Sequence, residues 1–214
     1  MLTKSISIRK TARYCVMGEP GPETRHVWFV CHGYGQLASD FITSFEPLND
    51  GQNLIVAPEA LHRFYLHGGN GKVGASWMTR EDRLNDIDDY IHYLDAVYSE
   101  IIENLDAKNV KITALGFSQG TATACRWALR GRNHLQRLIL WGGDIPPDTN
   151  WEKDRERLTN LEFILVYGTK DPYIKQEQIQ RQTEQLKHLG VPVRIETFNG
   201  HHEIEPNILK TLSQ

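Results

Sequence analysis

Six short apolar runs recur along the chain and alternate with longer amphipathic stretches. Several runs are apolar almost throughout, which is typical of strands that are covered on both faces. Such an alternation of strands and helices predicts an α/β fold: a doubly wound, mostly parallel sheet with helices on both faces. The runs cover residues 26–31, 53–57, 110–117, 137–141, 161–167 and 193–198.

The stretches between the runs predict several helices. One helix is expected to begin near Glu81 and Asp82, since apolar residues follow at steps of three and four. Further helices are predicted over residues 121–130 and 174–189 and near the carboxyl terminus, and residues 5–8 and 14–17 are expected to form an antiparallel pair at one sheet edge. The apolar stripe of the first helix consists of Leu84, Ile87, Ile91, Leu94, Val97, Ile101 and Leu105.

The length of the chain favours one domain. Its 214 residues are 40% hydrophobic, which is enough to bury a core, and no repeat or linker divides them. We therefore expect a single domain over residues 1–214. Fewer than a dozen residues separate the run at 137–141 from the next helix, near residue 151, so no cap domain is expected between them.

The charge balance argues against a polyanionic partner. Lysine and arginine number 24 against 27 acidic residues, and the net charge is −3, so nucleic acid is not an expected partner. One group of arginines has no acidic residue near it in the sequence. The simpler interpretation is a solvated helix face, and an anionic partner is the alternative. The group consists of Arg126, Arg130, Arg132 and Arg137.

Cysteine usage bears on the compartment. Cys15, Cys31 and Cys125 are odd in number and widely spaced, which favours buried, reduced thiols over a disulfide framework. No apolar segment approaches the length of a membrane span, and the amino terminus lacks the pattern of a signal peptide. We expect a cytoplasmic protein without integral membrane contact.

The segment most indicative of function is Gly116-Phe117-Ser118-Gln119-Gly120. This G-x-S-x-G motif ends an apolar run and opens a helical stretch, the setting in which a serine is exposed on a strained turn above a sheet. The following helix offers free N–H groups where an oxyanion would form. Ser118 is therefore a candidate nucleophile.

A serine hydroxyl needs a base and a group that orients the base. Asp171 lies in a turn after the run at 161–167 and is the favoured acid, with Asp144 after the preceding run as the rival. His201 and His202 follow the last run, and spacing alone does not choose between them. A metal site formed by His32, His201, His202 and Glu203 is a weaker alternative, because no ligand spacing supports it.

The run at 26–31 leads into His32-Gly33-Tyr34-Gly35-Gln36. A His-Gly segment in this place commonly supplies an oxyanion donor, and its glycines allow the chain to approach closely. The backbone N–H groups of Tyr34 and Gln119 are thus expected to converge on the developing negative oxygen.

Taken together, these motifs resemble the α/β-hydrolase superfamily and, within it, the phospholipase/carboxylesterase group that includes acyl-protein thioesterases. The most specific element is the Gly116–Gly120 segment, followed by Gly168-Thr169-Lys170-Asp171 and Gly200-His201-His202. The resemblance implies Ser118 as nucleophile, Asp171 as orienting acid and His202 as base. It implies the oxyanion role for Tyr34 and Gln119.

Two segments depart from the pattern of that group. Gln36 stands where an aspartate often follows the His-Gly segment, and Ser-Trp-Met-Thr at 76–79 replaces a segment that resembles Trp-Phe-Asp. Both departures concern the substrate more than the mechanism. Residues 58–80 form the one long stretch that is expected to be irregular, and it is expected to border the site.

The predicted function is hydrolysis of a small carboxylic ester or thioester through an acyl-enzyme, without metal or organic cofactor. Trp77 and Tyr173 are candidate substrate contacts, and a homodimer is compatible with the sequence. Three alternatives stay open: an acyltransferase that uses the same residues, a peptidase, and a non-catalytic binding module on the same fold.

Overall fold

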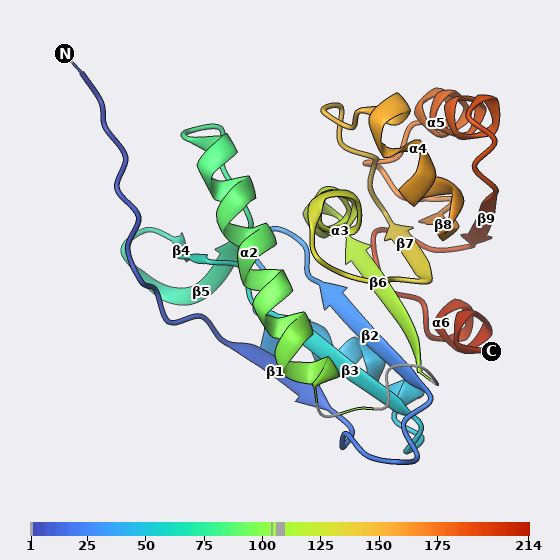
Figure 1. The fold of residues 1–214 in the computed structure, drawn as a ribbon, viewed down its shortest axis with the longest axis horizontal. Helices are drawn as coiled ribbons and strands as arrows, with labels where there is room; N and C mark the ends of the chain where they lie inside the picture. The colour runs from blue at the N-terminus through green and yellow to red at the C-terminus, as the bar shows by residue number, and fades with distance from the viewer. Residues whose placement is uncertain (1, 104, 106–109) are drawn as a thin grey trace.

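The computed structural model of the protein describes residues 2–103, 105 and 110–214. Its main element is a seven-stranded sheet with the strand order β1-β3-β2-β6-β7-β8-β9 (Figure 1). Neighbouring strands are parallel except at one edge, where β1 runs antiparallel to β3. The strands are β1 (Tyr14–Met17), β2 (His26–Cys31), β3 (Asn53–Pro58), β6 (Lys111–Phe117), β7 (Arg137–Trp141), β8 (Glu162–Gly168) and β9 (Val193–Phe198).

All six apolar runs form strands of this sheet, and no strand end differs from its prediction by more than one residue. The predicted edge strand at 14–17 is confirmed as β1. The prediction of a partner strand at 5–8 is wrong: β1 pairs with β3 instead, and the side chains of Ile6 and Ile8 are exposed. With both apolar side chains in solvent, this segment has no buried face to hold it against a sheet.

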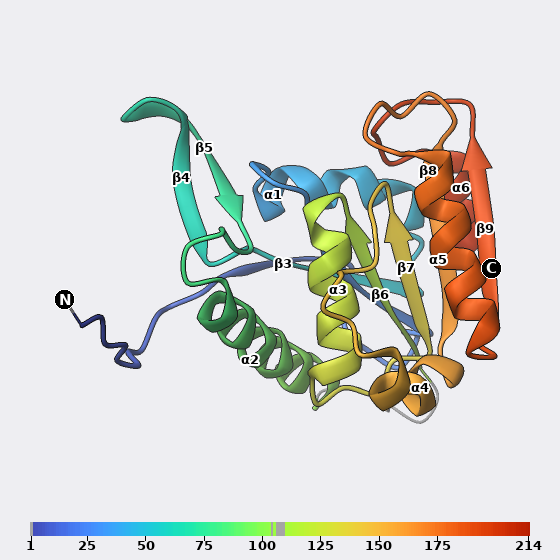
Figure 2. The same ribbon diagram turned by 90° about the horizontal axis from the view of Figure 1, so that it is seen from above.

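Helices cover both faces of the sheet (Figure 2). Core residues of α2, α3, α4 and α5 pack together on one face, whereas those of α1, the 3₁₀ helix η1 and α6 pack on the other. The α/β prediction with two helical layers is confirmed. The bounds are α1 (Ala38–Phe41), η1 (Ile42–Leu48), α2 (Arg83–Ile102), α3 (Gln119–Arg130), α4 (Trp151–Thr159), α5 (Gln176–His188) and α6 (Pro206–Ser213).

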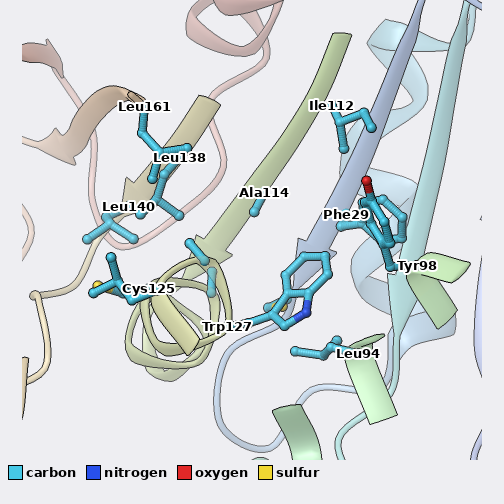
Figure 3. Close-up of a cluster of buried hydrophobic side chains, with 14 of the residues drawn as sticks. Phe29, Leu94, Tyr98, Ile112, Ala114, Cys125, Trp127, Leu138, Leu140 and Leu161 are labelled. Atoms are coloured by element: carbon cyan, nitrogen blue, oxygen red, sulfur yellow. The ribbon is translucent and has the colours of Figure 1, made fainter. Parts of the chain in front are cut away.

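Strand β2 shows why the apolar runs lack alternation. All six of its residues are buried, and successive side chains point to opposite faces of the sheet. Phe29 joins the cluster under α2 and α3, which Figure 3 shows in close-up, while Trp28 and Val30 join the cluster under α1, η1 and α6. A strand that is covered on both sides must therefore be apolar at nearly every position.

The predicted amphipathic helix is confirmed as α2. Its stripe residues Ile87, Leu94 and Val97 are buried, but Leu84 in the first turn is 67% exposed, so its assignment to the buried stripe was wrong. Tyr90 and Tyr98 complete the buried face. Within α2 the stripe is therefore buried from Ile87 onward but not in the first turn.

Residues 58–80 are more regular than predicted. They contain an antiparallel hairpin of β4 (His62–His67) and β5 (Asn70–Ser76), which stands apart from the main sheet (Figure 2). A bridge between Gln36 and Ala75 joins β5 to the loop after β2. The hairpin is therefore hydrogen-bonded to the loop that carries the His-Gly segment.

The arginine group does not form a solvated face. Arg126 and Arg137 are buried, and three of the four guanidinium groups bind carboxylates that come from distant segments. Three of the four positive charges are therefore paired within the fold, which weakens the alternative of an anionic partner. The pairs are Arg126–Asp148 at 2.6 Å, Arg130–Asp88 at 2.5 Å and Arg137–Glu162 at 2.6 Å.

All three cysteines are free thiols, as predicted. Cys31 and Cys125 are buried, and burial raises the pKa of the Cys125 thiol to about 12. A thiol with so high a pKa stays protonated and unreactive at neutral pH. Within the described ranges, no helix is long and apolar enough to cross a membrane.

Candidate active site

Ser118 occupies the turn between β6 and α3. Its backbone has φ 54° and ψ −118°, a conformation that non-glycine residues rarely adopt. The Ser118 N–H donates a hydrogen bond of 2.9 Å to the carbonyl oxygen of Trp141 at the end of β7. A strained turn that is held by a neighbouring strand is typical of a nucleophilic serine above a sheet.

The glycines of the motif are required by close backbone contacts. A Cβ on Gly116 would lie 2.1 Å from the carbonyl oxygen of Gly120, and a Cβ on Gly120 would lie 2.1 Å from that of Cys31. Such separations are far below any van der Waals contact. The tight turn around Ser118 can therefore form only if both positions lack a side chain.

Asp171 and His202 are in direct contact. The His202 Nδ1 atom lies 2.6 Å from Oδ2 of Asp171, whose side chain is buried in the turn after β8. The other carboxylate oxygen of Asp171 accepts a 2.9 Å hydrogen bond from the N–H of Tyr173. A carboxylate with both oxygens engaged can hold the imidazole in one orientation and one tautomer.

The His202 ring lies between two aromatic rings. The ring centroid of Phe117, the residue directly before Ser118, lies 4.8 Å from that of His202, and the centroid of Tyr173 lies 4.9 Å away on an edge-on ring. These contacts bring the imidazole to the serine turn. Among the described residues, no hydrogen bond joins Ser118 to His202, and such bonds are often long in a free enzyme.

Two glycines after β7 provide the space in which these groups meet. A Cβ on Gly142 would lie 3.1 Å from Cε1 of His202 and 3.5 Å from Oδ2 of Asp171. A Cβ on Gly143 would lie 2.7 Å from the carbonyl oxygen of Ser118. The ends of β6, β7 and β8 and the loop after β9 thus meet at one edge of the sheet.

The rival residues lie elsewhere. The carboxylate of Asp144 accepts hydrogen bonds from the side chains of Gln178 and Gln182 on α5, and burial raises its pKa. His201 is exposed, and its N–H donates to the carboxylate of Glu203. Of the two acids and two histidines that the sequence leaves open, Asp171 and His202 are the pair in contact.

The two expected oxyanion donors come from different elements. Gln119 is the first residue of α3, so its N–H has no partner within the helix. Tyr34 lies in a turn that is closed by a 3.3 Å bond from the Gln36 N–H to the Gly33 carbonyl oxygen, with Gly35 at φ 76°. Within the described residues, neither the Tyr34 N–H nor the Gln119 N–H donates a hydrogen bond to a protein acceptor.

The side chain of Gln119 has a role that the sequence reasoning missed. Its amide nitrogen donates to the Ser76 hydroxyl at 3.0 Å and to the Met78 carbonyl oxygen at 3.1 Å, and its oxygen accepts from the N–H of Trp77 at 3.2 Å. It ties the segment after β5 to the start of α3. No local pattern signals such a contact, since the partners are about 40 residues apart.

His32 is a structural residue of the same region. Its Nε2 accepts from the N–H of Ala60 at 3.1 Å, so Nδ1 carries the hydrogen that is donated to the Gly33 carbonyl oxygen at 2.8 Å. Burial lowers the pKa of the ring, which favours this neutral form. In the described residues, no group of three or more His, Cys, Asp or Glu side chains could hold a metal ion.

The two predicted substrate contacts differ in exposure. Trp77 is fully buried, packs against Tyr90 and donates from its indole nitrogen to the His32 carbonyl oxygen at 2.8 Å. Its prediction as a substrate contact is therefore wrong, because its ring is part of the core. Tyr173 is 73% exposed and lies against His202, where it remains a candidate.

A depression of about 550 Å³ lies between the loop at 147–150 and α5, and no candidate site residue lines it. Tyr34 is exposed at the site, and its ring centroid lies 5.2 Å from that of Phe64 on the hairpin. The hairpin thus contacts the loop that carries Tyr34.

A comparison with protein-family models matches residues 13–214 to the phospholipase/carboxylesterase family. The chain belongs to this family. A search of curated protein sequences found no significant match. The enzymes for which this family is named hydrolyse carboxylic esters.

Solved structures of this family's fold cover nearly the whole chain. Esterase PE8 is 23% identical with a TM-score of 0.72, covering 95% of this chain and 97% of its own. Acyl-protein thioesterase 2 of Zea mays is 20% identical with a TM-score of 0.71, covering 95% and 98%. A phospholipase/carboxylesterase of Dyadobacter fermentans is 18% identical with a TM-score of 0.68, covering 96% of both chains. At these identities the matches establish the fold of small α/β-hydrolases.

Proposed function

We propose that the protein is a serine hydrolase that cleaves a carboxylic ester or thioester through an acyl-enzyme intermediate. The main support is the position of His202, which is bonded to Asp171 and packs against Phe117, the residue directly before Ser118. A nucleophile, a base and a group that orients the base are the parts that this reaction needs. The family match adds the class of bond that is cleaved.

In the first step, Oγ of Ser118 attacks the carbonyl carbon of the substrate. His202 accepts the hydroxyl proton at Nε2, because its Nδ1 hydrogen is held by the Asp171 carboxylate. The ester or thioester bond then breaks, and the same proton passes from Nε2 to the departing alcohol or thiol. The acyl group stays on Ser118.

During attack, the carbonyl oxygen of the substrate gains negative charge. The N–H groups of Tyr34 and Gln119 are the proposed donors to this oxygen, and the amino terminus of α3 adds positive partial charge. Loss of one donor of this kind typically costs ~100- to ~1000-fold in rate. Because both donors are backbone groups, replacement of either side chain by any residue except proline leaves the N–H in place.

In the second step, water attacks the acyl-enzyme. The side chain of His202 is 20% exposed, so solvent can reach the base that activates this water. The product acid leaves and Ser118 regains its proton from His202. An alcohol or amine that takes the place of water would make the protein an acyltransferase.

The substrate is expected to lie on the surface between Tyr34 and Tyr173, which are both exposed. The rings of Tyr34 and Phe64 offer apolar contacts to an acyl chain or to a leaving group. Related structures are named as an esterase and an acyl-protein thioesterase, which supports testing both oxygen and sulfur esters.

The deciding experiment is labelling with a fluorophosphonate probe. The wild-type protein should react at Ser118 and hydrolyse p-nitrophenyl and thioester substrates, whereas Ser118→Ala should do neither. Absence of labelling in the folded wild-type protein would favour a binding module without catalysis. Added alcohols or amines measure the partition between hydrolysis and acyl transfer.

A further inference from the structure

The loop that carries Tyr34 contains two glycines, Gly33 and Gly35. Glycine populates many backbone conformations, so a Gly-Tyr-Gly segment does not by itself keep one N–H aimed in one direction. Something in the fold must restrain the peptide between Gly33 and Tyr34 if its N–H is to serve as an oxyanion donor.

Gln36 makes contacts that provide this restraint. Its side-chain oxygen accepts a 2.8 Å hydrogen bond from the Gly33 N–H, and its own N–H donates to the Gly33 carbonyl oxygen at 3.3 Å. The two residues are therefore joined in both directions around Tyr34. Neither bond uses the N–H of Tyr34 itself.

The main chain of Gln36 is in turn anchored on the hairpin. Its carbonyl oxygen accepts from the N–H of Ala75 at 3.1 Å, and the Gly35 N–H donates to the Ala75 carbonyl oxygen at 2.9 Å. These bonds hold the backbone of Gln36 against β5. The Gln36 side chain, which starts from this fixed backbone, can therefore hold Gly33 in place through the 2.8 Å bond.

The contact lies beside the candidate nucleophile. A Cβ on Gly33 would lie 2.9 Å from the side-chain oxygen of Gln36, 3.2 Å from Cβ of Ser118 and 3.2 Å from Cδ1 of Phe117. A shift of Gly33 would therefore change the distance between the Tyr34 peptide and Ser118. At this separation, displacements of about 1 Å can cost ~100-fold in rate.

We propose that Gln36 is a positioning residue of the proposed hydrolase: its side-chain oxygen holds the Gly33 N–H and thereby keeps the Tyr34 N–H aimed at the oxyanion. This inference rests on the proposed function. It assigns to Gln36 an effect on the transition state without direct contact with the substrate.

The test compares two substitutions that differ in one property. Gln36→Leu removes the acceptor, whereas Gln36→Glu keeps an acceptor oxygen at the same reach. We expect Gln36→Leu to lower kcat by ~10- to ~100-fold with KM changed by less than about threefold, since a donor is weakened in the transition state. Gln36→Glu should retain more of the kcat than Gln36→Leu.

A matched control separates positioning from stability. Gln136 also accepts a backbone N–H through its side chain, from Ile112 at 2.7 Å, at the opposite end of β6 from Ser118. Gln136→Leu should lower the thermal midpoint without lowering kcat. If Gln36→Leu behaves in the same way as Gln136→Leu, the bond is merely structural and the proposal is wrong.

A trifluoromethyl ketone supplies a second readout, because its adduct with a serine carries an oxyanion. The affinity for this inhibitor should fall in Gln36→Leu by the same factor as kcat/KM. Unchanged affinity, or a kcat for Gln36→Glu no higher than for Gln36→Leu, would overturn the positioning role alone. Full activity in Ser118→Ala would instead overturn the proposed function and this inference together.

Discussion

Nδ1 of His202 lies 2.6 Å from Oδ2 of Asp171, although 30 residues separate them in the chain. The contact forms because β8 and β9 are parallel neighbours and the loops at their carboxyl ends meet at one edge of the sheet. Carboxyl ends of parallel strands are where α/β proteins bind their ligands. The pair therefore lies where the fold favours a site.

The two adjacent histidines give the first prediction. His202→Ala should lower kcat toward a p-nitrophenyl ester by at least ~1000-fold, because the proposed base is lost. His201→Ala should lower it less than about threefold, since the His201 side chain is exposed. Steady-state kinetics of the two variants decide the matter, and the reverse order would show that His201 is the base.

The two candidate acids give the second prediction. Asp171→Asn should lower kcat by on the order of 1000- to 10,000-fold, because an amide does not favour the Nδ1–H tautomer of His202. Asp144→Asn is the matched control and should change kcat less than about threefold, because Asp144 bonds to α5 and not to His202. Equal losses in both variants would contradict the assignment of the orienting acid.

The fold was predictable where burial on both faces imposes an apolar sequence. Strands such as β2 and β7 are buried at every position, so each leaves a nearly continuous apolar run that can be recognised in the sequence. The β4–β5 hairpin was not predictable in this way. All of its residues from His62 to Gly71 are exposed or half-buried, and its order comes from pairing between strands.

The candidate site was predictable where one short segment carries the whole geometry. The turn at Ser118 needs glycines at fixed offsets, and these can be read from the sequence. Contacts between distant segments leave no such trace. The burial of Trp77 and the bonds from the Gln119 side chain depend on how the segment after β5 packs against α3, so neither could be inferred from residue types.

The close contact at Gly120 gives a third prediction. Gly120→Ala places a Cβ 2.1 Å from the Cys31 carbonyl oxygen, so β2 and α3 must separate and the free energy of unfolding should fall by about 3 kcal/mol or more. Fluorophosphonate labelling of Ser118 should fall as well. Urea unfolding monitored by tryptophan fluorescence measures the first effect.

Gly21→Ala is the control for this substitution. No atom lies within 4 Å of a Cβ at Gly21, and the free energy of unfolding should change by less than about 0.5 kcal/mol. Equal urea midpoints for the two variants would show that a Cβ beside the Cys31 carbonyl oxygen does not destabilise the fold.

A buried histidine far from the candidate site gives the last prediction, which concerns pH. Burial, together with the nearby charges of Arg137 and Lys111, lowers the pKa of His26 from 6.5 to about 3, and Nε2 of His26 lies 2.7 Å from the Thr113 hydroxyl. Between these pH values the unfolded chain binds a proton at His26 that the folded chain does not. The free energy of unfolding should therefore fall as pH drops below about 6.5, by up to about 1.4 kcal/mol per pH unit, and this loss should level off near pH 3.

His26→Gln removes the titrating group, so urea unfolding at pH 7, 6, 5 and 4 should show a shallower decline than in the wild-type protein. Parallel declines in the two proteins would mean that His26 takes up its proton without unfolding.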